Sequence, residues 1–198
     1  MTEVPTPERP EAVANPEQKE AINEDEPRIY VASLSDYNAG RLHGAWINAN
    51  QDTEDIEEDI KKMLTRSKEP IAEEWAIHDY EGFGPLYLSE YESIDHISRL
   101  SLGIVEHGIA FAHWANFLGS SQWDYLERFN EAFQGQWSTT VEFAESLLDD
   151  LGIDIDSMVD DRLLPYVNFD LDAFARDLSY DFHIVEDDNG GVYVFDNT

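Results

Sequence analysis

The residues best suited to chemistry are carboxylates that recur on a predicted helix near residue 140. Glu142, Glu145 and Asp149 fall at i, i+3 and i+7, opposite an apolar stripe that includes Val141 and Leu148. At about 1.5 Å of rise per residue, such carboxylates stand roughly 4.5–6 Å apart along the helix axis. A row of negative charge at this spacing is comparable to a phosphate backbone. The chemistry it predicts is the binding of a cationic surface.

Two groups of acidic residues extend this row. The first follows it along the chain and comprises Asp150, Asp154, Asp156, Asp160 and Asp161, and the second is the run Glu54, Asp55, Glu57, Glu58 and Asp59. Like charges at helical spacing cost stability, and few basic residues offset that cost here. A solvated acidic face explains any one of these clusters alone. It explains less well why acidic residues outnumber basic ones along the whole folded region.

The chain as a whole is strongly negative. Its 198 residues include 43 Asp and Glu against 12 Lys and Arg, so the formal net charge is −31. Residues 1–27 hold eight acidic and two basic residues, which leaves −25 on residues 28–198. Because 42% of the residues are hydrophobic and 12% aromatic, the chain can fold despite this self-repulsion. Such a charge repels nucleic acid and anionic membranes and favours a basic protein partner.

Residue patterns typical of enzymes are missing from the sequence. It has no His-Glu-x-x-His, no Gly-x-Ser-x-Gly and no glycine-rich phosphate loop. His107 and His113 are six residues apart, which does not place two metal ligands on one helical face. Asp154 and Asp156 begin like a calcium loop, but Met158 occupies the next ligand position. We therefore expect no enzyme activity, no catalytic residue, no cofactor and no metal site.

Signals for export or membrane insertion are also missing. The chain has no cysteine, which suits a reducing cytosol, and no apolar run approaches the roughly 18 residues of a membrane span. Its N-terminus lacks the basic and apolar regions of a secretion signal. We expect a cytoplasmic protein that binds neither membrane nor nucleic acid.

Composition and periodicity divide the chain into four segments. Residues 1–27 contain five of the eight prolines and almost no large apolar residues, which predicts a disordered acidic tail. Residues 28–93 are expected to form an α+β domain, residues 94–137 a helical middle domain and residues 138–198 a second α+β domain. The predicted fold class is therefore α+β.

Hydrophobic periodicity and turn residues predict the individual elements. Strands are expected at 28–34, 42–47, 74–79, 86–91, 182–186 and 192–195, with the first two and the last two paired as hairpins. Helices are expected at 53–66, 94–107, 111–118, 121–134, 139–151, 157–164 and 170–178. Gly108, Gly135 and Gly152 are expected to end helices, and Thr139 with Glu142 to form a capping box.

Several short stretches resemble one family. Residues 30–46 read YVASLSDYNAGRLHGAW and contain a Y-N-x-G-x-L-x-G-x-W core that is similar to the opening of ArdA-type antirestriction proteins. The stretches EEWAIHDYEGF at 73–83 and LSEY at 88–91 resemble the same family. So do FQG at 133–135 and FARDL at 174–178. These pieces occur in the family's order and together span about residues 28–198.

The resemblance implies three small consecutive domains in an elongated acidic arrangement, with a homodimer formed through the C-terminal domain. It further implies a DNA mimic that occupies the DNA-binding groove of type I restriction-modification enzymes. The family's antirestriction motif lies near the dimer contact and corresponds by position to residues 151–169. Leu163, Leu164 and Tyr166 are therefore the candidates for the dimer interface. They could equally pack the core of the C-terminal domain.

Two other classes of function are compatible with the composition. An acidic chaperone of basic DNA-binding proteins would bind many cationic partners with little demand on geometry. A salt-adapted protein of other function would carry its carboxylates as an adaptation to the solvent. It would unfold in dilute buffer, whereas a mimic must fold at the ionic strength of the cytosol.

Overall fold

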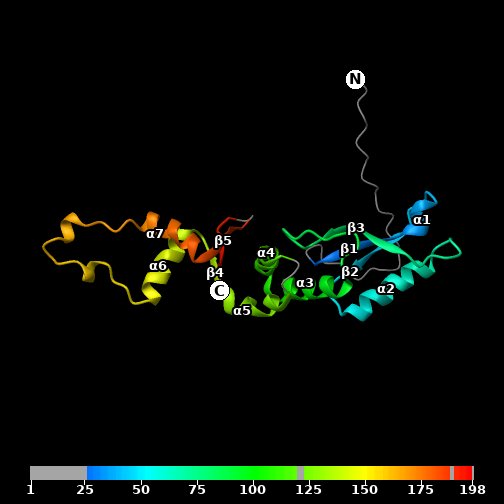
Figure 1. The fold of residues 1–198 in the computed structure, drawn as a ribbon, viewed down its shortest axis with the longest axis horizontal. Helices are drawn as coiled ribbons and strands as arrows, with labels where there is room; N and C mark the ends of the chain where they lie inside the picture. The colour runs from blue at the N-terminus through cyan, green and yellow to red at the C-terminus, as the bar shows by residue number, and fades with distance from the viewer. Residues whose placement is uncertain (1–25, 120–122, 188–189, 198) are drawn as a thin grey trace, which may run out of the picture.

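The computed structural model describes residues 26–119, 123–187 and 190–197. Two three-stranded antiparallel sheets follow one another along a long axis, with helices between and around them (Figure 1). The chain is therefore α+β, as the sequence predicts. The predicted acidic tail lies outside the described residues except for Glu26 and Pro27. Within the described ranges, no helix is long and apolar enough to cross a membrane.

The first sheet has the strand order β2-β1-β3. Its strands are β1 (Arg28–Ser33), β2 (Gly44–Asn48) and β3 (Trp75–Glu81). Alternation along β1 buries Ile29 and Val31 in the main core, together with Ile56 and Ile60 of α2 (Thr53–Thr65). The predicted pairing of β1 with β2 is confirmed, although their connection includes a short helix, α1 (Leu34–Asn38).

Two helices form the middle of the molecule, α3 (Ile94–His107) and α4 (Ile109–Leu118). The regularly spaced apolar residues of α3, including Ile97 and Leu100, are buried as their spacing predicts. Gly108 separates the two helices at φ +73, a backbone conformation that glycine adopts without steric cost.

The second sheet has the order β4-β6-β5, and two helices pack on one of its faces. The elements are β4 (Phe133–Trp137), β5 (Phe182–Glu186), β6 (Val192–Asp196), α6 (Thr140–Asp150) and α7 (Leu171–Asp177). The predicted hairpin between β5 and β6 is confirmed.

Both ends of α6 follow from its sequence. The Thr139 hydroxyl accepts the Glu142 N–H at 3.1 Å, and the Glu142 carboxylate accepts the Ser138 N–H at 2.8 Å, which closes a variant of the predicted capping box. At the other end, Gly152 has φ +66 and donates its N–H to the Asp149 carbonyl at 2.9 Å. Glycine in this position stops the helix, as predicted.

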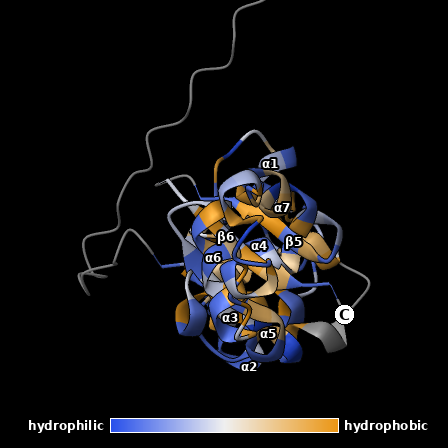
Figure 2. Ribbon diagram, turned by 90° about the vertical axis from the view of Figure 1, so that its left-hand side faces the viewer, coloured by the Kyte–Doolittle hydropathy of each residue, from blue (hydrophilic) through white to orange (hydrophobic). Residues whose placement is uncertain are grey.

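Strand β6 joins the two hydrophobic clusters of the molecule. Tyr193 and Phe195 point into the main core, which extends from the first sheet through α3 and α4. Val194, on the opposite face of the strand, packs with Phe143 of α6 and other residues of the second cluster. In the end-on view of Figure 2, hydrophilic residues mark outer segments such as α2, while hydrophobic ones gather further in. The middle helices and the second sheet therefore share buried side chains.

Two expectations within the first 134 residues are wrong. Residues 86–91 form no strand: Leu88 is buried in the core, but the segment is irregular, although its Glu90 carbonyl accepts the Ile77 N–H of β3 at 2.9 Å. The predicted helix 121–134 is replaced by a 3-10 helix η1 (Trp123–Arg128), a single turn α5 (Phe129–Ala132) and strand β4, while residues 121–122 lie outside the described residues. Gly135 is consequently inside a strand, at φ +113, rather than at a helix end.

The predicted helix 157–164 is also wrong. This part of the chain contains two 3-10 turns, η2 (Asp156–Met158) and η3 (Leu164–Tyr166), and a third, η4 (Leu178–Tyr180), follows α7. None of the residues in η2 or η3 is buried, so no apolar stripe is available to stabilise a longer helix. Pro165 lies inside η3 instead of ending a helix before it.

Candidate functional site

The carboxylates of α2 form the first acidic surface. Because Ile56, Ile60 and Met63 bury the opposite side of the helix, the acidic residues between them are directed to solvent. Glu54, Asp55, Glu57 and Glu58 are exposed, and Asp59 is partly buried.

Two lysines partly offset the charge of this surface. Lys61 lies 3.8 Å from Glu57, and Lys62 lies 3.2 Å from Glu58 and 3.0 Å from Asp59. The hydrogen bonds to Asp59 and Glu58 raise the pKa of Lys62. The surface of α2 is therefore acidic but contains paired charges, and Glu54 and Asp55 form no ion pair within the described residues.

The row on α6 forms the second acidic surface. Glu142, Glu145, Asp149 and Asp150 are all exposed, since Phe143 and Ala144 occupy the buried side. Glu142 has a second role, because its carboxylate caps the start of the helix. In the described part of the chain, Glu145 and Asp149 form no ion pair, so their charges remain available to a partner.

The acidic residues after α6 are exposed in irregular chain. Asp154, Asp156, Asp160 and Asp161 all reach solvent. Arg162 donates to both oxygens of Asp160, at 2.9 and 2.8 Å, and this hydrogen bonding lowers the pKa of Asp160 to about 2. Asp160 is thus partly neutralised by a neighbour, whereas the other three are not paired in this way within the described residues.

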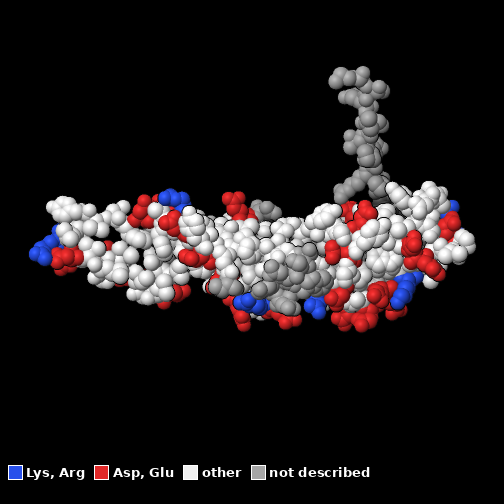
Figure 3. Space-filling view, viewed as in Figure 1, with Lys and Arg blue, Asp and Glu red and all other residues white. Residues whose placement is uncertain are grey.

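The predicted carboxylates are brought together as two groups rather than one. The α2 group lies at one end of the long axis and the α6 group toward the other (Figure 1). Figure 3 shows a dense group of Asp and Glu over α2, and further groups of Asp and Glu toward the opposite end. A partner that contacts both groups must therefore extend along much of the molecule.

The structure places apolar side chains beside the carboxylates of the second acidic surface, which the sequence pattern does not predict. An open hollow of about 660 Å³ lies between the end of α6 and the segment that leads to α7. Its acidic lining residues are Glu145, Asp149, Asp154 and Asp156, and its apolar ones include Leu148, Ile155 and Phe169. The second acidic surface is therefore concave in part.

The three candidates for a dimer interface lie close to this hollow in the sequence. Leu163 is 54% exposed and Tyr166 is 85% exposed, while Leu164 is partly buried. None of the three belongs to either hydrophobic cluster of the described residues. Met158 and Val167 are exposed as well, so residues 151–169 present an apolar surface to solvent.

One carboxylate in the family-like segment 30–46 is internal. Asp36 is 1% exposed and accepts hydrogen bonds from Ser33 at 2.8 Å, from Ser67, and from Arg41 at 3.4 Å. The bond from Ser67 is the main reason why the pKa of Asp36 is lowered; those from Ser33 and Arg41 add to it, and burial opposes it. Asp36 therefore ties α1 to the chain after α2 and offers no charge to a partner.

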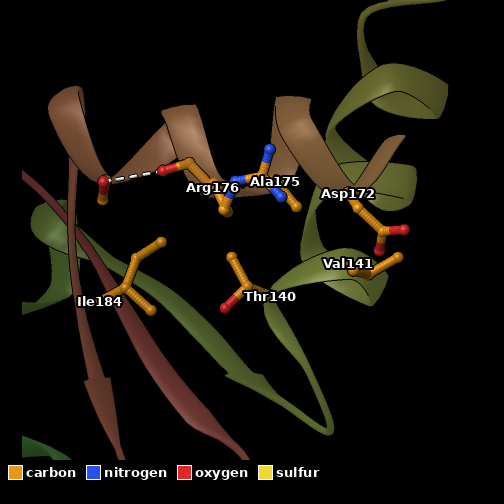
Figure 4. A pocket seen from close by; sticks show the side chains of 7 residues that line it. Thr140, Val141, Asp172, Ala175, Arg176 and Ile184 are labelled. Carbon is orange, nitrogen blue, oxygen red and sulfur yellow. Dashed lines mark hydrogen bonds between the residues drawn. The ribbon is translucent and has the colours of Figure 1, made fainter. Parts of the chain in front are cut away.

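A second hollow, of about 460 Å³, lies between α6, α7 and β5 (Figure 4). It is lined by Thr140, Val141, Asp172, Ala175, Arg176, Ser179 and Ile184. Its Ser179 hydroxyl donates a hydrogen bond to the Arg176 carbonyl at 2.8 Å, so this hydroxyl is directed to the backbone rather than to a basic side chain. Across the described residues, no three His, Cys, Asp or Glu side chains are grouped so as to hold a metal ion.

A group of aromatic rings and histidines joins α4 to the second sheet. His183 of β5 stacks on Phe117 with ring centroids 3.8 Å apart, and His113 lies 5.5 Å from Tyr193. Burial, together with the charge of His113, lowers the pKa of His183. The neutral form of His183 is therefore the one that fits the folded protein.

Lowering the pH from about 7.5 to about 5.5 is expected to destabilise the protein in part through His183. Its folded-state pKa lies below 6.5, so the unfolded chain binds the proton more readily. The stability contributed by neutral His183 is present above about pH 6.5 and is lost as the pH falls through the folded-state pKa. In His183→Phe, which keeps an aromatic ring at this position, the Tm should fall by several degrees less over this range. An equal fall in both proteins would argue against the role of His183.

Comparison with known proteins agrees with the sequence motifs. A family model described as Antirestriction protein (ArdA) matches residues 29–193, which is more than half of the chain and extends from β1 into β6. No curated protein matches the chain.

Proposed function

The chain belongs to the ArdA antirestriction family, and we propose that it inhibits type I restriction-modification enzymes by occupying their DNA-binding groove as a DNA mimic. The observation that supports this proposal most strongly is the pair of exposed acidic surfaces, on α2 and on α6 with the chain that follows it. Enzymes that bind duplex DNA present Lys and Arg to its phosphates. The same side chains would contact these carboxylates.

The amount of charge is sufficient for such a role. Residues 28–198 carry −25, so two chains carry about −50, close to the phosphate charge of about 25 base pairs of duplex. The elongated arrangement in Figure 1 would distribute this charge along a groove rather than concentrate it. The inhibitor acts by occupancy in this proposal, with neither catalysis nor a cofactor, in the cytoplasm where the enzyme meets its DNA.

The proposal includes a three-domain chain and a homodimer formed through the C-terminal domain. Leu163, Leu164 and Tyr166 are the residues we assign to the interface. In their support, two of them are well exposed and none joins a hydrophobic cluster of the described residues. Burial of these side chains against a second copy would remove apolar surface from water, which is the main favourable term in most protein association.

Replacing Leu163 and Tyr166 with alanine is expected to raise the dimer dissociation constant at least about tenfold, which corresponds to roughly 1.4 kcal/mol. The protein should stay folded, because neither side chain contributes to a core. Sedimentation equilibrium measures the constant. Leu42→Ala with Tyr180→Ala is the matched control, since Leu42 is 72% and Tyr180 is 83% exposed elsewhere. An unchanged constant in the first variant would remove both residues from the interface.

The function itself is tested by titrating the protein into a type I enzyme that is cleaving unmodified DNA. Stoichiometric loss of cleavage is the expected result. A basic DNA-binding protein unrelated to restriction, assayed for DNA binding in parallel, should be unaffected. Equal loss in both assays would favour an acidic chaperone, and no loss of cleavage would contradict the proposal.

A further inference from the structure

A smaller hollow, which we name the α2–α3 hollow, lies where the start of α2, the start of β3 and the start of α3 meet. Its volume is about 350 Å³, within the range of about 300–1,000 Å³ typical of ligand sites. The lining residues that matter for binding are Glu57, Trp75, Tyr91, Glu92 and Asp95. We infer that this hollow binds one arginine side chain of the inhibited enzyme, an inference that rests on the proposed function.

The charge of the lining favours a cation. Three of its residues are carboxylates, and none is Lys or Arg. Glu57 and Asp95 have half-exposed side chains, at 51% and 56%, so both can reach an incoming group. Each is paired with a cation on its own helix, Lys61 at 3.8 Å and Arg99 at 3.3 Å. Exposed pairs of this kind are weak, so an incoming guanidinium can replace them.

The third carboxylate, Glu92, is held in place by hydrogen bonds to neighbouring side chains. Its side chain is 20% exposed and contacts His96 Nδ1 at 3.0 Å. Burial raises the pKa of Glu92, but the hydrogen bonds from His96 and Ser89 outweigh it, and the pKa is lowered. Glu92 therefore presents a fixed negative charge at the side of the hollow.

Two aromatic rings distinguish this site from a plain acidic surface. Trp75 is partly buried and packs against the main core, which holds its indole in place. Tyr91 is 70% exposed and makes no ring contact within the described residues. A guanidinium stacks on aromatic faces and also matches carboxylates with its planar set of N–H donors. Arginine is the side chain that can use both parts of the lining.

A distributed charge surface and a specific hollow make different predictions for neighbouring residues. If charge alone matters, Glu54 and Glu57 are equivalent, since both are exposed carboxylates on α2. If the hollow binds arginine, Glu57 matters more than Glu54, which does not line it. Tyr91 then matters although it carries no charge.

The test measures binding of the full-length protein to a type I restriction-modification enzyme by isothermal titration calorimetry. Tyr91→Ala and Glu57→Gln are each expected to weaken binding about tenfold, as central anchor contacts do. The control Tyr87→Ala should stay within about twofold, because Tyr87 is 82% exposed outside the hollow. The control Glu54→Gln should show only the loss of a few fold expected for any one carboxylate of the α2 surface, since Glu54 lies on the same helix outside the hollow. Tyr91→Ala should leave the salt dependence unchanged, since no charge is removed.

Equal losses in each variant and its control would overturn the inference while leaving the proposed function intact. A second measurement does not depend on the enzyme. N-acetyl-arginine amide, titrated into the protein and followed by NMR, should shift the Trp75 indole and Tyr91 resonances. N-acetyl-citrulline amide, which lacks the positive charge, should not. Absence of shifts, or equal shifts with both compounds, would overturn the inference even if the wild-type protein does not bind the enzyme.

Discussion

Changing Glu54, Glu58, Glu142, Glu145 and Asp149 together to their amides is expected to weaken inhibition of a type I enzyme by roughly a hundredfold. All five are exposed. Each exposed carboxylate in an ion pair contributes about 0.2–1 kcal/mol, and every 1.4 kcal/mol is tenfold in affinity. The two sets lie on separate helices toward opposite ends of the molecule, so their contributions should add (Figure 1).

The same substitutions made singly are expected to weaken inhibition only a few fold each. Added salt should weaken the wild-type complex, and the fivefold variant should show a shallower salt dependence because fewer charges are involved. The control exchanges Glu and Asp for one another at the same five positions, which preserves charge. Inhibition constants at several salt concentrations measure both effects. One dominant carboxylate among these five positions, or a flat salt dependence, would contradict a distributed surface.

Replacing Phe195 with alanine is expected to destabilise the protein by about 3–5 kcal/mol. Phe195 is fully buried and lies 5.4 Å from both Trp114 and Phe133, measured between ring centroids. The substitution removes a large side chain at the point where α4 and the second sheet share the main core. The remaining cavity adds to the lost transfer free energy, because close-packed surroundings relax only partially.

Urea denaturation monitored by circular dichroism measures this loss. Tyr180→Ala is the matched control, since Tyr180 is an aromatic residue of the same C-terminal region that is 83% exposed. Its free energy of unfolding should change by less than about 0.5 kcal/mol. A loss below about 1 kcal/mol for Phe195→Ala would show that the second sheet does not depend on its packing with the middle helices.

Elements with a regular apolar stripe were predictable from the sequence. In α2 and α3 the residues expected on the buried face, such as Ile60 and Leu100, are buried. The helix predicted over 121–134 failed because Phe129 and Phe133 are four residues apart and fit a helical stripe, although β4 begins at Phe133. Pairing of β4 with β6, some 60 residues later in the chain, overrides that local pattern.

The sequence predicts which carboxylates form the acidic surfaces, but not all of the side chains that these carboxylates contact. Spacing places Glu145 and Asp149 on the exposed side of α6, as the structure shows. The Thr139-x-x-Glu142 spacing also predicts the capping of α6, but no spacing rule reveals that Arg162 pairs with Asp160, because that pair depends on side-chain geometry in an irregular segment. The α2–α3 hollow was not predictable, since its lining comes from three segments that only the tertiary fold brings together.

The most direct test of DNA mimicry is a competition experiment. A fluorescently labelled duplex that contains the recognition site is bound to a type I restriction-modification enzyme, and the unlabelled protein is titrated in while anisotropy is followed. If the protein occupies the DNA groove, it displaces the duplex completely, and the concentration needed for half displacement rises in proportion to the free duplex concentration. The account would be contradicted if the concentration for half displacement did not depend on the free duplex concentration. A ternary complex of enzyme, duplex and protein would contradict it as well.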